Sequence, residues 1–343
     1  MFYSINILRP IALVLAAVLC MPVLAIGDTP GYARAQHLVV FGDSLSDTGN
    51  KYAVRGLVND PPYDGLNEFG VPSDPYSTED GIYFSNGSVW IEKVAAVLGD
   101  FGASRPALGD WPLAGNYAWG GAHANPPPFD DGNRHLEAQV TAYLDDVGYD
   151  VRPDTLHVIF IGGNDVVAAL LMLSGGTPFP DVLAHLGFTV GAVDQALQRL
   201  TDAGARRFLV LNVPDVGLIP AVAHPGGKAL LSCFSELVDF GRTSRCPGVG
   251  VSLELPDSLA GVAERRAGEG LEVTTVDTYA FIRALADSPE SLGYSNVADK
   301  CVTPLVAPYA CPNPNAYLFW DGLHPTEATH RLLAALVLNR LGY

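Results

Sequence analysis

Positive charge is scarce in this sequence. Its 343 residues include 20 Lys and Arg against 37 Asp and Glu, which gives a formal net charge of −17. Nucleic acids and anionic membrane surfaces are bound through basic patches, so neither is expected as the main partner. Neutral and zwitterionic lipids remain compatible with this charge. A composition of 48% hydrophobic and 17% charged residues is that of a folded protein.

The apolar run near the N-terminus, IALVLAAVLCMPVLA, is short for a membrane span. Pro22 interrupts it, and it does not reach the roughly 20 apolar residues that cross a bilayer. Arg9 precedes the run, and the run ends in small residues at Ala25, which is typical of a secretory signal peptide. We therefore expect residues 1–25 to be cleaved after Ala25 and the mature protein to be secreted or periplasmic. A membrane anchor is the weaker alternative.

Cysteine is also sparse, with five residues in the chain, and Cys20 leaves with the signal peptide. An even number of cysteines then remains, which in an exported protein suggests disulfide bonds. Proximity favours Cys233–Cys246 and Cys301–Cys311, although four cysteines allow three pairings. A zinc site is the alternative, but neither pair shows the close two-residue spacing of common zinc knuckles.

Internal repeats and low-complexity tracts are absent, and short apolar runs alternate with helical patterns. This rhythm predicts an α/β fold with a parallel sheet of about five strands and helices on both faces. The expected strands are 37–41, 155–161, 206–213, 271–277 and one before Asn116, and the expected helices are 88–99, 135–148, 188–205 and one that starts at Pro325. No composition shift divides residues 26–343, so we expect a single domain. Loop insertions are expected near 51–82 and 222–257, and we place substrate contact there.

Polar groups follow three of the predicted strands. Gly42-Asp43-Ser44 follows the first, the segment 116–121 follows the second, and Gly162-Gly163-Asn164-Asp165 follows the third. In a doubly wound sheet, ligands bind outside the carboxyl ends of the strands, so these segments are expected to meet at one edge. Each alone is ordinary turn material, and Ser44 alone could be a helix cap.

A fourth segment, FWDGLHPT at 319–326, places Asp321 three residues before His324. Ester hydrolysis by a serine needs a base that takes the hydroxyl proton and a carboxylate that fixes the tautomer of that base. Ser44, His324 and Asp321 are the residue types that this chemistry requires. Taken alone, the pair could be a capping acid and a surface histidine beside a helix.

The four segments together resemble the GDSL subgroup of the SGNH hydrolases, a family of serine esterases, lipases and acyltransferases. The resemblance covers roughly residues 37–340 and rests on GDSLSDTGN, NYAWGGA, GGND and DGLHPT, in that order. FSNGSVWIEKVA at 84–95 and NVPDVGLIP at 212–220 are also similar to that family. The stretch 222–257 departs from it.

The resemblance implies a flavodoxin-like three-layer α/β/α sandwich, the SGNH hydrolase fold. It implies Ser44 as nucleophile, His324 as general base and Asp321 as the carboxylate that orients it. Oxyanion donors are implied at Ser44, Gly121 and Asn164. The expected protein is a secreted serine ester hydrolase that needs no metal or cofactor. Its expected substrates are lipid, phospholipid or short acyl esters, cleaved through an acyl-serine intermediate, with acyl transfer as a further capacity.

The same residue types also allow other functions. A metal-dependent phosphoesterase would use Asp43, Asp47, Asp165, Asp321 and His324 as hard ligands. Carbohydrate deacetylation is a variant of the esterase chemistry, and an exported binding domain is the non-enzymatic alternative. The mature chain is expected to have no stable membrane span.

Three further histidines are expected on the surface, outside the site. They are His185, His224 and His330.

Overall fold

The computed structural model describes residues 37–107, 114–127, 130–243, 246 and 252–343. The expected signal peptide, residues 1–25, lies outside the described residues. Within these ranges, the structure contains no helix with the length and apolar character needed to cross a membrane.

A parallel sheet forms the centre of the fold, with strand order β1-β4-β5-β8. Its strands are β1 (His37–Gly42), β4 (Thr155–Phe160), β5 (Arg207–Leu211) and β8 (Glu272–Val276). Asn116 forms a parallel bridge to Val40, and the hydrogen bond from Tyr117 N to Val40 O (2.8 Å) continues this pairing. The segment around Asn116 is thus a fifth strand position beside β1. The resulting chain order 2-1-3-4-5 is that of the flavodoxin-like fold, as expected.

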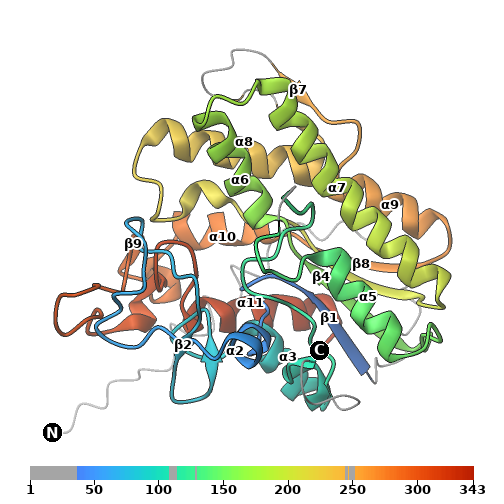
Figure 1. Cartoon of the computed structure of the whole chain (residues 1–343), viewed down its shortest axis with the longest axis horizontal. Helices are drawn as coiled ribbons and strands as arrows, with labels where there is room; N and C mark the ends of the chain where they lie inside the picture. The colour runs from blue at the N-terminus through green and yellow to red at the C-terminus, as the bar shows by residue number, and fades with distance from the viewer. Residues whose placement is uncertain (1–36, 108–113, 128–129, 244–245, 247–251) are drawn as a thin grey trace, which may run out of the picture.

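The two faces of the sheet are covered by different helices (Figure 1). Because side chains alternate along a strand, Val39 and Phe41 of β1 enter one core and Leu38 and Val40 enter the other. The first core is covered by α5 (Leu136–Asp146), α7 (Phe179–Asp202) and α9 (Leu259–Gly268), and the second by α3 (Trp90–Leu98) and α11 (Glu327–Arg340). This arrangement is the expected three-layer α/β/α sandwich.

The predicted helices form, with shifted ends. The helix α7 begins at Phe179, well before the predicted 188, and α11 begins at Glu327 behind the cap residue Thr326, instead of at Pro325. The remaining elements were not predicted: α2 (Asn50–Arg55), α6 (Gly163–Ser174), α8 (Pro225–Phe240), α10 (Thr278–Asp287), β2 (Tyr76–Ser77), β3 (Ile82–Tyr83), β6 (Arg242–Thr243), β7 (Leu253–Glu254), β9 (Asn296–Lys300), β10 (Tyr317–Phe319), and the 3₁₀ turns η1 (Phe101–Ser104), η2 (Val216–Leu218), η3 (Glu290–Leu292) and η4 (Pro314–Ala316).

The two stretches expected as loops differ from each other. Residues 56–81 are largely irregular, with β2 as the only regular element there. The expectation of a loop at 222–257 is wrong for residues 225–240, which form α8, and residues 244–245 and 247–251 lie outside the described residues. Leu231, Phe234, Leu237 and Val238 recur at helical spacing along α8 and are buried in the core.

Both disulfides join the cysteines that proximity favoured. Cys233 of α8 pairs with Cys246, with 5.4 Å between their Cα atoms, and Cys301 pairs with Cys311 at 4.9 Å. The second disulfide closes a short loop that follows β9.

Candidate active site

Ser44 lies in the turn that follows β1, and its side chain is buried. Gly42 ends the strand against β4, where a Cβ atom would lie 2.6 Å from the Phe160 carbonyl oxygen, so only glycine is accommodated. Asp43 then accepts a hydrogen bond from Leu45 N at 2.9 Å, and its carbonyl accepts from Ser46 N at 3.1 Å. These bonds make a tight turn and present the serine at the carboxyl edge of the sheet.

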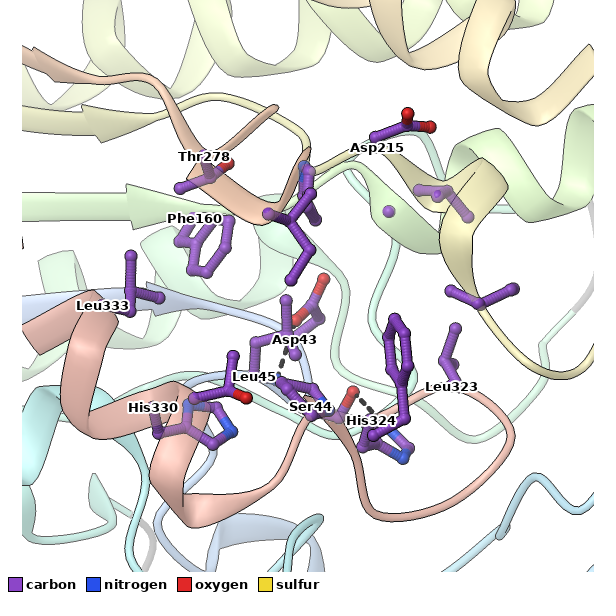
Figure 2. A pocket seen from close by; sticks show the side chains of 18 of the residues that line it. Asp43, Ser44, Leu45, Phe160, Asp215, Thr278, Leu323, His324, His330 and Leu333 are labelled. Carbon is purple, nitrogen blue, oxygen red and sulfur yellow. Dashed lines mark hydrogen bonds between the residues drawn. The ribbon is translucent and has the colours of Figure 1, made fainter. Parts of the chain in front are cut away.

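His324 bridges Ser44 and Asp321. Its Nε2 lies 2.9 Å from Ser44 Oγ, although the two residues are 280 positions apart in the chain (Figure 2). Its Nδ1 lies 2.8 Å from Asp321 Oδ2. All three side chains are buried, with at most 5% of each residue exposed. The chain therefore holds a hydroxyl, an imidazole and a carboxylate in one continuous hydrogen-bonded line.

Asp321 is fixed by the turn between β10 and α11. Its Oδ1 accepts hydrogen bonds from the backbone N–H groups of Leu323 and His324, both at 2.7 Å. Its Oδ2 also accepts a hydrogen bond from the Tyr76 hydroxyl at 2.9 Å. Tyr76 lies on β2, and no pattern in the sequence pointed to it. Burial, with the nearby Asp321 charge, raises the pKa of Tyr76 well above its usual value, so this phenol stays a donor.

Gly121 and Asn164 reach the same edge from two other strand ends. Trp119 N donates to Gly42 O at 3.0 Å. This bond keeps the segment 116–121, called the glycine segment below, beside the turn that carries Ser44. Asn164, in the first turn of α6, donates one amide N–H to Ala122 O at 2.8 Å. A side-chain amide carries two N–H donors, so this bond orients Asn164 and leaves its second donor available.

Three residues between positions 47 and 51, at the start of α2, hold the glycine segment in place. Asn50 donates to the carbonyls of Asn116 and Ala118, at 2.8 and 2.9 Å. Asp47 accepts from Gly120 N at 2.8 Å. Lys51, which is buried, donates from Nζ to the Gly120 carbonyl at 2.8 Å, and burial lowers its pKa.

The strand-end carboxylates are occupied by backbone N–H groups. Asp165 accepts from Ala124 N and Asn125 N, both at 2.9 Å, and Asp43 accepts from Leu45 N. Burial raises the pKa of Asp43 to about 7. Across the described part of the chain, no group of three or more His, Cys, Asp or Glu side chains is arranged to hold a metal ion. Asp43 and Asp165, both named for the metal-dependent alternative, thus bind backbone N–H groups of the loops at the strand ends.

A largely apolar cavity of about 80 Å³ adjoins Ser44 and His324 (Figure 2). Its wall includes Phe160, Phe281, Ile282, Leu323 and Leu333. It also includes His330 of α11, which is 1% exposed. The expectation that His330 lies on the surface is therefore wrong, whereas His224 is exposed as expected. The cavity has the apolar walls that a hydrocarbon group of a substrate requires.

The sequence is similar to proteins of one enzyme family. A family model described as GDSL-like Lipase/Acylhydrolase matches residues 38–337. A thermolabile hemolysin of Vibrio parahaemolyticus is 27% identical over 323 residues, which cover 88% of this chain and 63% of the hemolysin. A GDSL esterase/lipase of Arabidopsis thaliana is 25% identical over 338 residues, covering 90% of each chain. A phosphatidylcholine-sterol acyltransferase of Aeromonas hydrophila is 26% identical over 350 residues, covering 93% of each.

Proposed function

The chain belongs to the GDSL-like lipase/acylhydrolase family, and on that premise we propose that it is a secreted serine ester hydrolase. It cleaves carboxylic esters through an acyl-serine intermediate. The observation that carries this proposal is the line of hydrogen bonds from Ser44 Oγ through the His324 ring to Asp321 Oδ2.

The first half-reaction forms the acyl-enzyme. Ser44 Oγ attacks the ester carbonyl carbon while His324 Nε2 takes the hydroxyl proton, and Asp321 keeps the ring in the tautomer that has Nδ1 protonated. Negative charge develops on the carbonyl oxygen. The backbone N–H groups of Ser44 and Gly121 and the second amide N–H of Asn164 stabilise it, each worth roughly 3–4 kcal/mol. The ester C–O bond then breaks, and the His324 proton passes to the departing alkoxide.

The second half-reaction releases the acyl group. Water loses a proton to His324 Nε2 and attacks the acyl carbon, and Ser44 Oγ recovers the proton as it leaves. An alcohol in the place of water would receive the acyl group by the same steps, so hydrolysis and acyl transfer share one site. The similarity to an acyltransferase supports this second capacity.

The cavity beside Ser44 supports a short acyl group as the substrate. Its volume of about 80 Å³ is far below the roughly 300–1,000 Å³ of pockets that enclose drug-sized ligands. Apolar walls favour hydrocarbon, and burial of each CH₂ group contributes about 0.8 kcal/mol. We therefore place short acyl esters ahead of long-chain lipid and phospholipid esters.

Export is part of the proposal. The two disulfides are typical of proteins from oxidising compartments. Together with the N-terminal pattern at residues 1–25, they support a cleaved signal peptide and a secreted or periplasmic mature protein.

Substitution of the nucleophile tests the proposal. With p-nitrophenyl butyrate, Ser44→Ala should lose about 10⁴-fold or more in kcat, and a fluorophosphonate should modify the wild-type protein at Ser44 only. Ser46→Ala is the matched control from the same turn. Its hydroxyl accepts a hydrogen bond from Trp90 Nε1 at 3.1 Å, so this variant should lose stability but keep its reaction with fluorophosphonate. Near-wild-type turnover by Ser44→Ala would refute the proposal.

A further inference from the structure

His330 is a buried imidazole in the wall of the apolar cavity. It is 1% exposed, and neither ring nitrogen has a partner among the described residues. Its ring extends from α11 toward the turn that carries Ser44 and Leu45 (Figure 2). Buried side-chain nitrogens are normally hydrogen-bonded, because an unpaired one loses its hydration without replacement. A buried imidazole in this state is therefore a candidate for binding a polar group of the substrate.

The charge state of His330 limits what it can bind. Burial, with repulsion from Lys93 and His324, lowers its pKa to about 3, so the ring is neutral at physiological pH. A neutral imidazole offers one N–H donor and one nitrogen acceptor. A hydroxyl group is the matching partner, because it also donates one hydrogen bond and accepts others.

The rest of the cavity argues against a charged partner. Its described lining includes the acids Asp43 and Asp215 and no Lys or Arg. A carboxylate or phosphate would therefore be desolvated there without a counter-charge, which is strongly unfavourable. A plain alkyl chain would enter the apolar part but would leave both ring nitrogens unpaired.

We propose that His330 is a specificity-determining residue that selects short acyl groups carrying a hydroxyl group. The inference rests on the proposed ester hydrolase function and names its substrate class. Once Ser44 holds the acyl group, the chain lies against the apolar wall and its hydroxyl bonds the His330 ring. A site built around a hydrogen bond discriminates strongly against the analogue that lacks it, since its own polar group is then left unpaired.

Pairs of esters that differ only by hydroxyl and methyl test this selection. The pairs are p-nitrophenyl 2-hydroxybutyrate with 2-methylbutyrate and 3-hydroxybutyrate with 3-methylbutyrate, in both enantiomers where they exist. Each kcat/KM ratio is divided by the corresponding ratio for alkaline hydrolysis, which removes the electronic effect of the hydroxyl. The wild-type protein should then prefer the hydroxyacyl member of at least one pair by about tenfold or more.

The His330→Phe variant assigns the preference to this residue. It should lower the hydroxyl-to-methyl ratio about tenfold, and His330→Gln, which keeps a donor and an acceptor, should retain part of the preference. A stability role alone predicts a lower melting temperature in His330→Phe and an unchanged ratio. Equal rates within every pair for the wild-type protein would overturn the inference, and so would a preference that His330→Phe leaves intact. Equal wild-type rates overturn the inference even if a variant does not fold.

A binding measurement separates this inference from the hydrolase proposal. The ¹⁵N signals of the His330 ring in Ser44→Ala protein are followed during titration with 2- and 3-hydroxybutyramide and with 2- and 3-methylbutyramide. A shift with a hydroxy compound and not with its methyl counterpart supports the inference without any turnover. Identical responses within both pairs contradict it, whereas failure of Ser44-dependent hydrolysis would count against the hydrolase proposal only.

Discussion

Tyr76 donates its hydroxyl hydrogen to Asp321 Oδ2, the same oxygen that bonds the His324 ring. The two residues are 245 positions apart, and the oxygen–oxygen distance is 2.9 Å. With the two backbone N–H groups on Oδ1, the carboxylate accepts four hydrogen bonds in a buried site. This set fixes the rotation of the carboxylate and stabilises its charge, so Tyr76 is a positioning residue for the proposed base.

Removal of the Tyr76 hydroxyl should weaken catalysis without abolishing it. We expect Tyr76→Phe to lower kcat about tenfold and the free energy of unfolding by about 1–3 kcal/mol, because a hydrogen bond to a charged group is lost. The measurements are steady-state kinetics with p-nitrophenyl butyrate and urea denaturation. Tyr63→Phe is the matched control, since Tyr63 packs edge-on against Tyr76 with 5.6 Å between ring centroids. Equal kcat values for both variants would contradict the positioning role.

The position of Lys51 leads to a second prediction. Its Nζ donates to the Gly120 carbonyl, and the N–H of Gly121 belongs to the same peptide group. A cation on that carbonyl polarises the peptide and so strengthens the N–H that we propose as an oxyanion donor. Lys51→Met should therefore lower kcat about tenfold and leave KM nearly unchanged.

Lys93→Met is the control for this substitution, because Lys93 bonds Ser88 and Glu327, at 2.6 and 2.8 Å, and none of its hydrogen bonds among the described residues reaches the glycine segment. The kinetic constants of both variants are compared with one ester of good turnover. A rise in KM at constant kcat for Lys51→Met would assign Lys51 to ground-state binding instead.

Much of this site follows from sequence because it depends on a general rule of parallel sheets. Ser44, the glycine segment and Asn164 each follow a strand, and the carboxyl ends of neighbouring parallel strands lie at one edge. The disulfide pairs can be predicted from the sequence because their cysteines lie close together in the chain. The family resemblance added His324 and Asp321, whose spacing alone would also suit a helix start.

Other parts of the site have no local signal. Tyr76 belongs to a largely irregular stretch, and only the folded chain brings it to Asp321. His330 lies on a predicted helix, and the polar residues of an amphipathic helix normally face solvent. The helix α11 instead packs on the sheet and also borders the cavity, which buries more of its circumference. Gly226 and Gly227 lie in the first turn of α8, and because glycine is a poor helix former, the start of this helix is not apparent from the sequence.

Cavity size leads to a third prediction, on acyl-chain length. Among p-nitrophenyl esters, kcat/KM should be highest for acetate to butyrate and at least about tenfold lower for decanoate and palmitate, because a long chain exceeds the described cavity. Leu333→Ala removes a side chain from the wall and should move the optimum to longer chains. It should also lower the free energy of unfolding by about 2–5 kcal/mol.

Val337→Ala is the matched control for chain length. Val337 lies one helical turn further along α11 and is fully buried, but it does not line the cavity. It should lose stability and keep the wild-type chain-length profile. A profile that peaks at palmitate in the wild-type protein would show that the cavity opens far beyond its volume in this structure.

The last prediction concerns stability in acid and follows from the lowered pKa of His330. The group titrates near 6.5 in the unfolded chain and at about 3 in the folded protein, because burial disfavours its charged form. Between these values the unfolded chain binds a proton that the folded chain does not, so the free energy of unfolding falls as the pH is lowered. His330→Phe removes this proton uptake. The stability of the variant relative to wild type should therefore rise as the pH falls from 6.5, by on the order of 1 kcal/mol per pH unit at most.

Urea denaturation at pH 7.5, 6.5, 5.5 and 4.5 measures this difference, and carboxylates such as Asp43 contribute equally to both proteins and cancel. Val337→Ala on the same helix supplies the control, since the loss of a buried side chain without a titratable group should give a difference that does not depend on pH. A constant difference for His330→Phe over this range would mean that the ring accepts a proton in the folded protein. The ring would then bear a charge in the cavity below about pH 6.5, and the proposed selection of a hydroxyl by the neutral ring would hold only at higher pH.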